Sequence, residues 1–124
     1  MLDTSIFVAG EQGRELQRQL PDEVAVSVVT LAELELGVLV ARDSDTRAQR
    51  LATLTRVREH TSGLPADERV ASSYARLAAG ELAKGRKPRV HDTWIAATAL
   101  VHDSEVWTHD SDFSSFEAVG VVQV

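Results

Sequence analysis

The chain has 124 residues, of which 44% are hydrophobic and 26% are charged, a composition that excludes a disordered chain and is typical of one globular domain. It contains no cysteine, no apolar run of about 20 residues and no basic start followed by an apolar stretch, which excludes disulfides, thiolate metal sites and a membrane span and predicts a cytoplasmic protein. The formal net charge of −6 argues against tight, unspecific binding to nucleic acid, unless metal ions and a local basic patch supply the attraction.

The first half of the chain is predicted to alternate strands with helices. The run Val24–Val29 is almost entirely β-branched, which indicates a strand buried on both faces. Thr30 is a candidate N-cap for the helix that follows. The predicted elements are a short strand ending at Asp3, helices over Ser5–Ala9 and Glu15–Leu20, a strand over Val24–Val29, a helix from Thr30 that closes at Asp43–Asp45, and a helix over Thr46–His60 with an apolar stripe at Leu51, Leu54 and Val57.

The second half continues the same alternation after a break at Gly63–Pro65. The predicted elements are helices over Asp67–Lys84 and Thr93–Val101 and strands over Glu105–Thr108 and Val119–Val124. The helix over Thr93–Val101 is apolar nearly all round and is expected to be buried. Strands that alternate with helices predict one α/β domain over residues 1–124, with a mostly parallel sheet and helices on both faces. Right-handed crossovers then place the C-terminal ends of the strands on one rim.

Acidic residues stand at four of the junctions between these elements, namely Asp3, Glu33, Asp92 and Asp110, with Asp112 close behind. In an open α/β sheet such junctions converge on one crevice. Carboxylates gathered there would repel one another unless a cation held them together. Hard divalent ions such as Mg²⁺ and Mn²⁺ prefer oxygen ligands and bind phosphate groups as well. The pattern therefore predicts a metal-dependent phosphodiesterase.

Each acidic residue also has a structural alternative. Asp3 and Asp92 are candidate N-caps, and Thr30 with Glu33 matches a capping box. Asp110 and Asp112 fit an Asx turn. Four junctions that all use an acid, where serine, threonine or asparagine would cap equally well, favour the metal-site interpretation.

In order along the chain, four motifs resemble those of the PIN-domain nucleases, and the size and layout are similar to the VapC toxins of VapBC toxin–antitoxin modules. They are Asp3-Thr4-Ser5, Thr30–Gly37 as Thr-x-Ala-Glu-Leu-x-x-Gly, Asp92–Leu100 as Asp-x-x-Ile-Ala-Ala-x-Ala-Leu, and Thr108–Phe113 as Thr-x-Asp-x-Asp-Phe. The resemblance covers essentially the whole chain.

This resemblance implies a three-layer α/β/α fold and an endoribonuclease that uses Mg²⁺ or Mn²⁺ to cleave RNA and so inhibits translation. It also implies a homodimer and a cognate VapB-type antitoxin that blocks the active site. Carried over by position, the catalytic and metal-binding acids are Asp3, Glu33, Asp92 and Asp110, with Asp112 as a fifth metal ligand.

The residues expected to contact substrate form two groups. Thr4, Ser5 and Thr108 would hydrogen-bond the carboxylates or the phosphate, although they also fit plain turn residues. Arg86, Lys87 and Arg89 belong to a basic connector that would grip the RNA backbone, although a solvated loop is the alternative for any charge run.

Two other functions compete with this interpretation. A phosphotransferase that used Asp3 as its nucleophile would need a second aspartate two residues later, where this chain has Ser5. A PIN-like module without activity, acting only through a protein partner, is the second alternative, and the presence of all four acids speaks against it.

Overall fold

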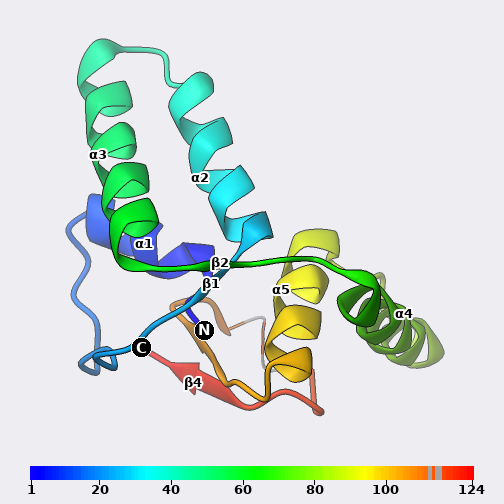
Figure 1. The fold of residues 1–124 in the computed structure, drawn as a ribbon. Helices are drawn as coiled ribbons and strands as arrows, with labels where there is room; N and C mark the ends of the chain where they lie inside the picture. The colour runs from blue at the N-terminus through cyan, green and yellow to red at the C-terminus, as the bar shows by residue number, and fades with distance from the viewer. Residues whose placement is uncertain (112, 114–115) are drawn as a thin grey trace.

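Short parallel strands lie between two groups of helices, and the last of these strands is at the lower edge of the molecule in Figure 1. The computed structural model describes residues 1–111, 113 and 116–124. The elements in chain order are α1 (Thr4–Glu11), β1 (Val26–Ser27), α2 (Val28–Leu39), α3 (Ser44–His60), β2 (Gly63–Leu64), α4 (Glu68–Ala83), α5 (Val90–Val101), β3 (Val106–Thr108) and β4 (Val121–Gln123). Among the described helices, none is long and apolar enough to cross a lipid bilayer.

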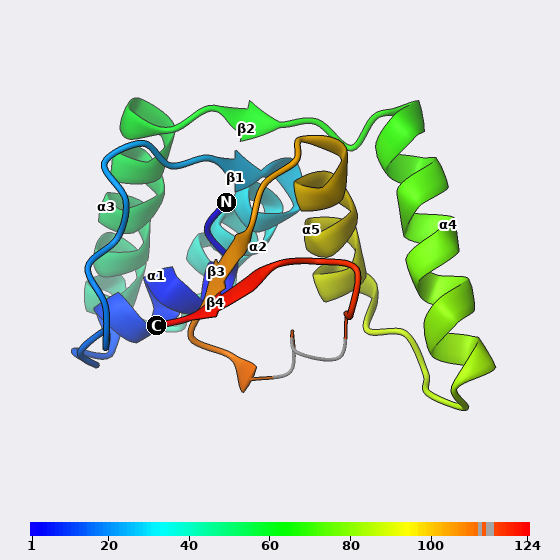
Figure 2. The ribbon, with the colours of Figure 1, turned by 90° about the horizontal axis from the view of Figure 1, so that it is seen from below.

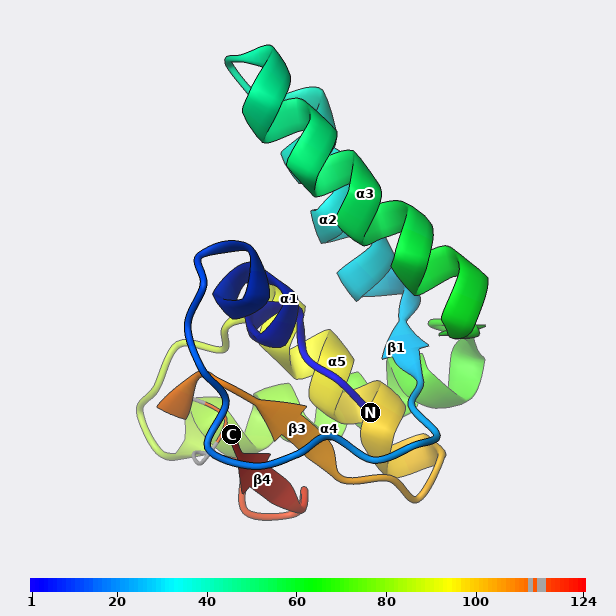
Figure 3. The same cartoon turned by 90° about the vertical axis from the view of Figure 1, so that its left-hand side faces the viewer.

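The first strand consists of little more than Leu2, and this residue joins two pairs of strands into one sheet. Strand β1 pairs with β2 and β3 pairs with β4, all in parallel. Leu2 forms parallel bridges to Val26 of β1 and to Trp107 of β3, and Figure 3 shows the N-terminal segment between these strands. The spatial order is therefore β2, β1, Leu2, β3, β4. This arrangement places Asp3 and the residues that follow β3 at the same end of the sheet.

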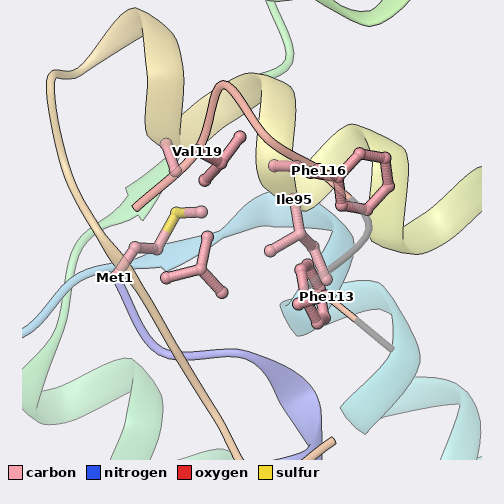
Figure 4. Packing of buried hydrophobic residues seen from close by; sticks show 8 residues of the cluster. Met1, Ile95, Phe113, Phe116 and Val119 are labelled. Carbon is pink, nitrogen blue, oxygen red and sulfur yellow. The ribbon is translucent and has the colours of Figure 1, made fainter. Parts of the chain in front are cut away.

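The two faces of the sheet carry separate hydrophobic clusters, because side chains alternate along a strand. Met1 and Val106 belong to a cluster that includes Ile95 of α5, shown in Figure 4, whereas Leu2 packs in a second cluster with Leu54 of α3. Figure 2 shows α1 and α3 on one side of the strands and α5 with α4 on the other. The layers confirm the predicted α/β/α fold with a parallel sheet.

The strand predicted over Val24–Val29 is shorter than expected. Only Val26 and Ser27 pair with β2, and α2 begins at Val28. The N-cap is Ser27, whose side chain accepts a hydrogen bond from the backbone N–H of Val29 at 3.0 Å. Thr30 is therefore inside the helix, and its prediction as the N-cap was wrong because a better-placed hydroxyl stands three residues earlier.

The helix predicted over Glu15–Leu20 is absent, and this segment has no regular secondary structure. Helix α1 ends at Glu11, and Gly13 has a φ of 68°, a conformation that glycine adopts at little cost. The N–H of Arg14 then bonds to the carbonyl of Ala9 at 2.9 Å and closes the helix. Only a few residues remain before Pro21, too few to nucleate another helix without strong packing.

Two smaller predictions were also wrong, and one strand was not predicted. Asp43 does not close α2, which ends at Leu39, but caps α3 by accepting a hydrogen bond from Thr46. The predicted break in the helical pattern at Gly63–Pro65 is confirmed, but Gly63 and Leu64 also form strand β2, which pairs with β1. Leu51, expected in the buried stripe of α3, is 50% exposed.

Candidate active site

Four elements bring the predicted acids to the same end of the sheet. Asp3 follows the central bridge at Leu2, and Asp110 comes two residues after β3, the neighbour of that bridge. Glu33 lies on α2 and Asp92 in the first turn of α5. Because β1 leads directly into α2, the start of α2 lies at the same end of the sheet as Asp3.

Asp3 is almost fully buried, with 4% of its surface exposed, and the two hydrogen bonds that its carboxylate makes with described residues use the same oxygen. Oδ2 accepts from the backbone N–H of Ser5 at 3.3 Å and from the hydroxyl of Thr108 at 3.0 Å. Asp3 is therefore the N-cap of α1, as the capping interpretation predicted. The cap uses only Oδ2, so it is compatible with a second role for Oδ1.

The hydroxyl of Thr108 joins the end of β3 to the start of α1. Besides its bond to Asp3, Oγ1 accepts a hydrogen bond from the N–H of Asp110 at 2.9 Å. It also lies 3.1 Å from the hydroxyl of Ser5, which in turn accepts from the N–H of His109 at 2.9 Å. Thr108 is fully buried. These two hydroxyls hold backbone and carboxylate groups, and a contact with substrate remains a prediction for them.

Glu33 is half-buried and is held by the first turn of α1. The hydroxyl of Thr4 donates to Oε1 of Glu33 at 2.8 Å, and Nδ1 of His91 lies 3.5 Å from Oε2. The capping-box alternative for Glu33 is wrong, because α2 is capped by Ser27 instead. Thr4 thus hydrogen-bonds a carboxylate of the candidate site, which was one of the roles predicted for it.

Asp92 lies beside the guanidinium of Arg89. Nη2 of Arg89 is 2.7 Å from Oδ2 of Asp92, and Nη1 is 3.8 Å from Oδ2 of Asp110. The N-cap of α5 is Arg89, which makes no capping bond with its side chain. Asp92 stands three residues into the helix and is not its cap, so the capping alternative is wrong for this residue also.

The pKa of Asp92 shows that the acids share one electrostatic environment. This pKa is raised from 3.8 to about 6, and burial is the largest cause. Arg89 opposes the rise, whereas the negative charges of Asp3, Asp110 and Glu33 contribute to it. A carboxyl group is affected in this way only when other carboxylates are near and not fully neutralised.

This donor set suits a hard divalent cation in its chemistry. All four acids carry carboxylate oxygens, and the negative charges of Asp3, Asp110 and Glu33, which add to the effect of burial on the pKa of Asp92, are ones that a cation would relieve. Within residues 1–111, 113 and 116–124, however, no three Asp, Glu or His side chains stand in an arrangement that would hold a metal ion. Asp112 lies outside the described residues. The assignment of these acids as ligands therefore remains a prediction.

The three basic residues predicted to bind RNA, in the connector between α4 and α5, differ in their contacts. Arg86 makes a bidentate pair with the buried Glu81, at 2.8 Å and 3.2 Å, whereas Lys87 is exposed. Arg89 reaches the acids. A hollow of about 350 Å³ opens there, lined by Glu33, Arg89, Val90, His91 and Asp92. Binding of the RNA backbone by Arg86, Lys87 and Arg89 remains a prediction.

Sequence reasoning did not identify two of these contacts. The ion pair of Arg89 with Asp92 could have been predicted from their spacing in the sequence, because residues three apart on a helix are neighbours. No sequence pattern predicts the approach of His91 to Glu33, because this contact depends on how α5 packs beside α2. The carbonyl of Gly37, one turn after Glu33 on α2, accepts a hydrogen bond from Arg50 of α3 at 2.7 Å.

Asp92 is expected to make the stability of the metal-free protein depend on pH. Because its folded-state pKa of about 6 lies above the ordinary 3.8, the contribution is present below about pH 4 and is lost as the pH rises through 6. We expect the free energy of unfolding of the wild type to fall by about 1–3 kcal/mol relative to Asp92→Asn between these limits. Urea titrations of both proteins at several pH values measure this difference. Parallel curves of unfolding free energy against pH for the wild type and Asp92→Asn would contradict the prediction.

Comparison with known proteins identifies relatives over the whole chain. The family model described as PIN domain matches residues 1–119. The chain is 46% identical to Ribonuclease VapC5 of Mycobacterium tuberculosis, covering 100% of this chain and 92% of that protein. It is 36% identical to Ribonuclease VapC4 of the same organism, covering 100% and 95%. The crystal structure of the toxin–antitoxin system VapBC-5 from M. tuberculosis matches with a TM-score of 0.88 and 43% identity, covering 99% and 96% of the two chains.

Proposed function

This chain belongs to the PIN-domain family and is a ribonuclease of the VapC type, and we propose that it cleaves RNA internally with a divalent metal ion, Mg²⁺ or Mn²⁺. Full-length identity of 46% to a protein named as a ribonuclease is the observation that carries the activity. The shared electrostatic environment of Asp3, Glu33, Asp92 and Asp110 supports the place of the reaction. The proposed nuclease domain comprises residues 1–124.

Each acid has a distinct place in the proposed mechanism. Asp3 and Asp92 would be the central ligands, and Glu33 and Asp110 would hold the metal directly or through water. A divalent ion bound there would supply an activated water nucleophile and would stabilise charge on the phosphate. Asp112 is proposed as a further ligand on the basis of the motif alone.

The hydroxyls and the basic connector complete the proposal. The hydroxyl of Thr108 donates to Oδ2 of Asp3, and the hydroxyl of Thr4 donates to Oε1 of Glu33. Such partners orient ligands and reduce the reorganisation that binding requires. Arg86, Lys87 and Arg89 would contact the RNA backbone, and Ser5 the phosphate or its neighbours.

A protein partner follows from the same family. The structure matched at a TM-score of 0.88 is that of a toxin–antitoxin complex. We propose that this chain is the toxin of such a pair, that a VapB-type antitoxin covers its active site, and that the free toxin inhibits translation in the cytoplasm as a homodimer.

Metal binding is the direct test of this site. We expect Mn²⁺ to raise the melting temperature of the purified protein by about 5–10 °C at a hundredfold excess over its Kd, because a ligand that binds only the folded state stabilises it. RNA cleavage should require Mg²⁺ or Mn²⁺ and stop when EDTA is added. A binding module without activity would show neither effect. Sequencing the 5′ ends of cellular RNA after brief expression would then identify the cleaved site.

A further inference from the structure

The guanidinium of Arg89 lies among the acids that are proposed to hold the metal. It is 2.7 Å from Asp92 on one side and 3.8 Å from Asp110 on the other. Its Nη2 atom is inaccessible to solvent. The side chain therefore links the first turn of α5 to the segment after β3, which are the two places that supply these acids.

A guanidinium in this place has two consequences for a metal ion. It remains charged at all physiological pH values, so it cannot leave the acids by losing a proton. A carboxylate oxygen in contact with Nη2 has one coordination position fewer for a metal, and a positive charge a few ångströms away repels a divalent cation. Arg89 thus supplies the same kind of charge that a metal would supply.

We propose that Arg89 is a built-in competitor of the metal, which neutralises Asp92 and Asp110 in the metal-free protein and must move away before they bind a divalent ion. The inference rests on the proposed function, because it takes these acids as ligands. Arg89 belongs to the connector between α4 and α5 and is the N-cap residue of α5 without a side-chain capping bond. Its side chain can therefore leave the acids without uncapping the helix.

This competition would couple metal binding to RNA binding. The ion pair with Asp92 and the proposed contact with an RNA phosphate both use the guanidinium fork, so one excludes the other. Release of Arg89 by the metal makes the fork available to a phosphate. By linkage, a substrate that takes the fork lowers the cost of metal binding by the same factor.

The test compares Mn²⁺ binding to the wild type and to Arg89→Gln by isothermal titration calorimetry, without RNA. We expect the variant to bind Mn²⁺ about tenfold more tightly, the ratio that corresponds to removal of one modest competing interaction. Without metal, the variant should melt at a lower temperature than the wild type, because the acids have lost their counter-ion. With saturating Mn²⁺ the gap between the two melting temperatures should shrink.

Arg58→Gln is the matched control. Arg58 is also paired with a carboxylate, at 3.0 Å from Glu35 on the exposed faces of α2 and α3, and the substitution removes the same charge. We expect its Mn²⁺ affinity to stay within about twofold of the wild type, since exposed ion pairs are largely screened. An equal gain in this control would show that net charge, and not Arg89, sets the affinity, and would overturn the inference.

The remaining outcomes separate the inference from the proposed function. Equal or weaker Mn²⁺ binding by Arg89→Gln, with normal binding by the wild type, overturns the inference and leaves the metal site standing. No Mn²⁺ binding by either protein overturns both. Should Arg89→Gln fail to fold, Arg89→Lys replaces it. Lysine keeps the charge but lacks the planar fork, and its Mn²⁺ affinity should lie between those of the other two.

Discussion

Replacing Asp3 with asparagine is expected to lower the rate of RNA cleavage by at least about a thousandfold, because several kcal/mol of transition-state stabilisation depend on a correctly held metal. The fold should be preserved. Oδ2 of Asp3 accepts both observed hydrogen bonds, and the amide oxygen of asparagine can accept them in the same place. The amide nitrogen would then replace Oδ1 and cannot bind a metal ion. Cleavage of a labelled RNA, with the melting temperature measured in parallel, checks both parts.

Asp43→Asn is the control for this variant. Asp43 is also the N-cap of a helix, accepting a hydrogen bond from the N–H of Thr46 at 2.8 Å, but it lies at the start of α3, where α2 and α3 project from the body of the molecule in Figure 1. Asparagine is as good an N-cap as aspartate. We expect Asp43→Asn to cleave RNA at the wild-type rate. If Asp3→Asn were equally active, Asp3 would be a helix cap alone.

Replacing Thr108 with valine is expected to slow RNA cleavage about 10–100-fold, the usual cost of removing a residue that orients a metal ligand. Valine has the same shape but cannot donate to Asp3 or accept from the N–H of Asp110, which leaves two polar groups without this partner. The free energy of unfolding should fall by about 1–3 kcal/mol for the same reason. Kinetics with Mn²⁺ and urea unfolding measure the two effects, and Thr108→Ser should restore both.

Thr98→Val distinguishes this orienting role from the general cost of losing a buried hydroxyl. Thr98 is fully buried like Thr108, but its hydroxyl donates to the carbonyl of Trp94 within α5, at 2.8 Å. We expect wild-type activity and a smaller loss of stability. The interpretation of Thr108 fails if both valine variants lose activity to the same extent, or if Thr108→Val cleaves RNA at the wild-type rate.

The candidate acids were selected from the sequence because they stand near junctions of strands and helices. Asp3 and Asp110 follow strands and Asp92 lies in the first turn of α5, as predicted. Glu33 was expected in the first turn of its helix but lies in the second turn of α2, because Ser27 and not Thr30 caps that helix. The pKa of Asp92 responds to the other three acids. The capping alternative is confirmed for Asp3, which caps its helix, and was wrong for Glu33 and Asp92. A capping pattern cannot decide this by itself, because a hydroxyl a few residues away, such as that of Ser27, competes for the same backbone N–H groups.

Local pattern was sufficient for the class of fold and for the type of chemistry. The alternation of β-branched runs with apolar-striped segments predicted a parallel sheet between layers of helices, since it depends only on periodicity along the chain. The nearly all-apolar face of α5 likewise predicted its burial, and residues from Thr93 to Ala99 are buried apart from Trp94. The acids by themselves predicted only a metal-dependent phosphodiesterase, and the expectation of an RNA substrate came from the resemblance to the PIN-domain nucleases.

Tertiary structure alone decided how the side chains meet. The bond from Thr108 to Asp3 and the approach of His91 to Glu33 join residues that are far apart in sequence, and no local propensity encodes them. The single-residue first strand at Leu2 and the two-residue strand β2 exist only because neighbouring strands supply their hydrogen bonds. For Arg89, the sequence and the tertiary structure each determine a part. Its charge and its spacing from Asp92 are properties of the sequence, but its position next to Asp110 depends on the packing of α5 beside β3.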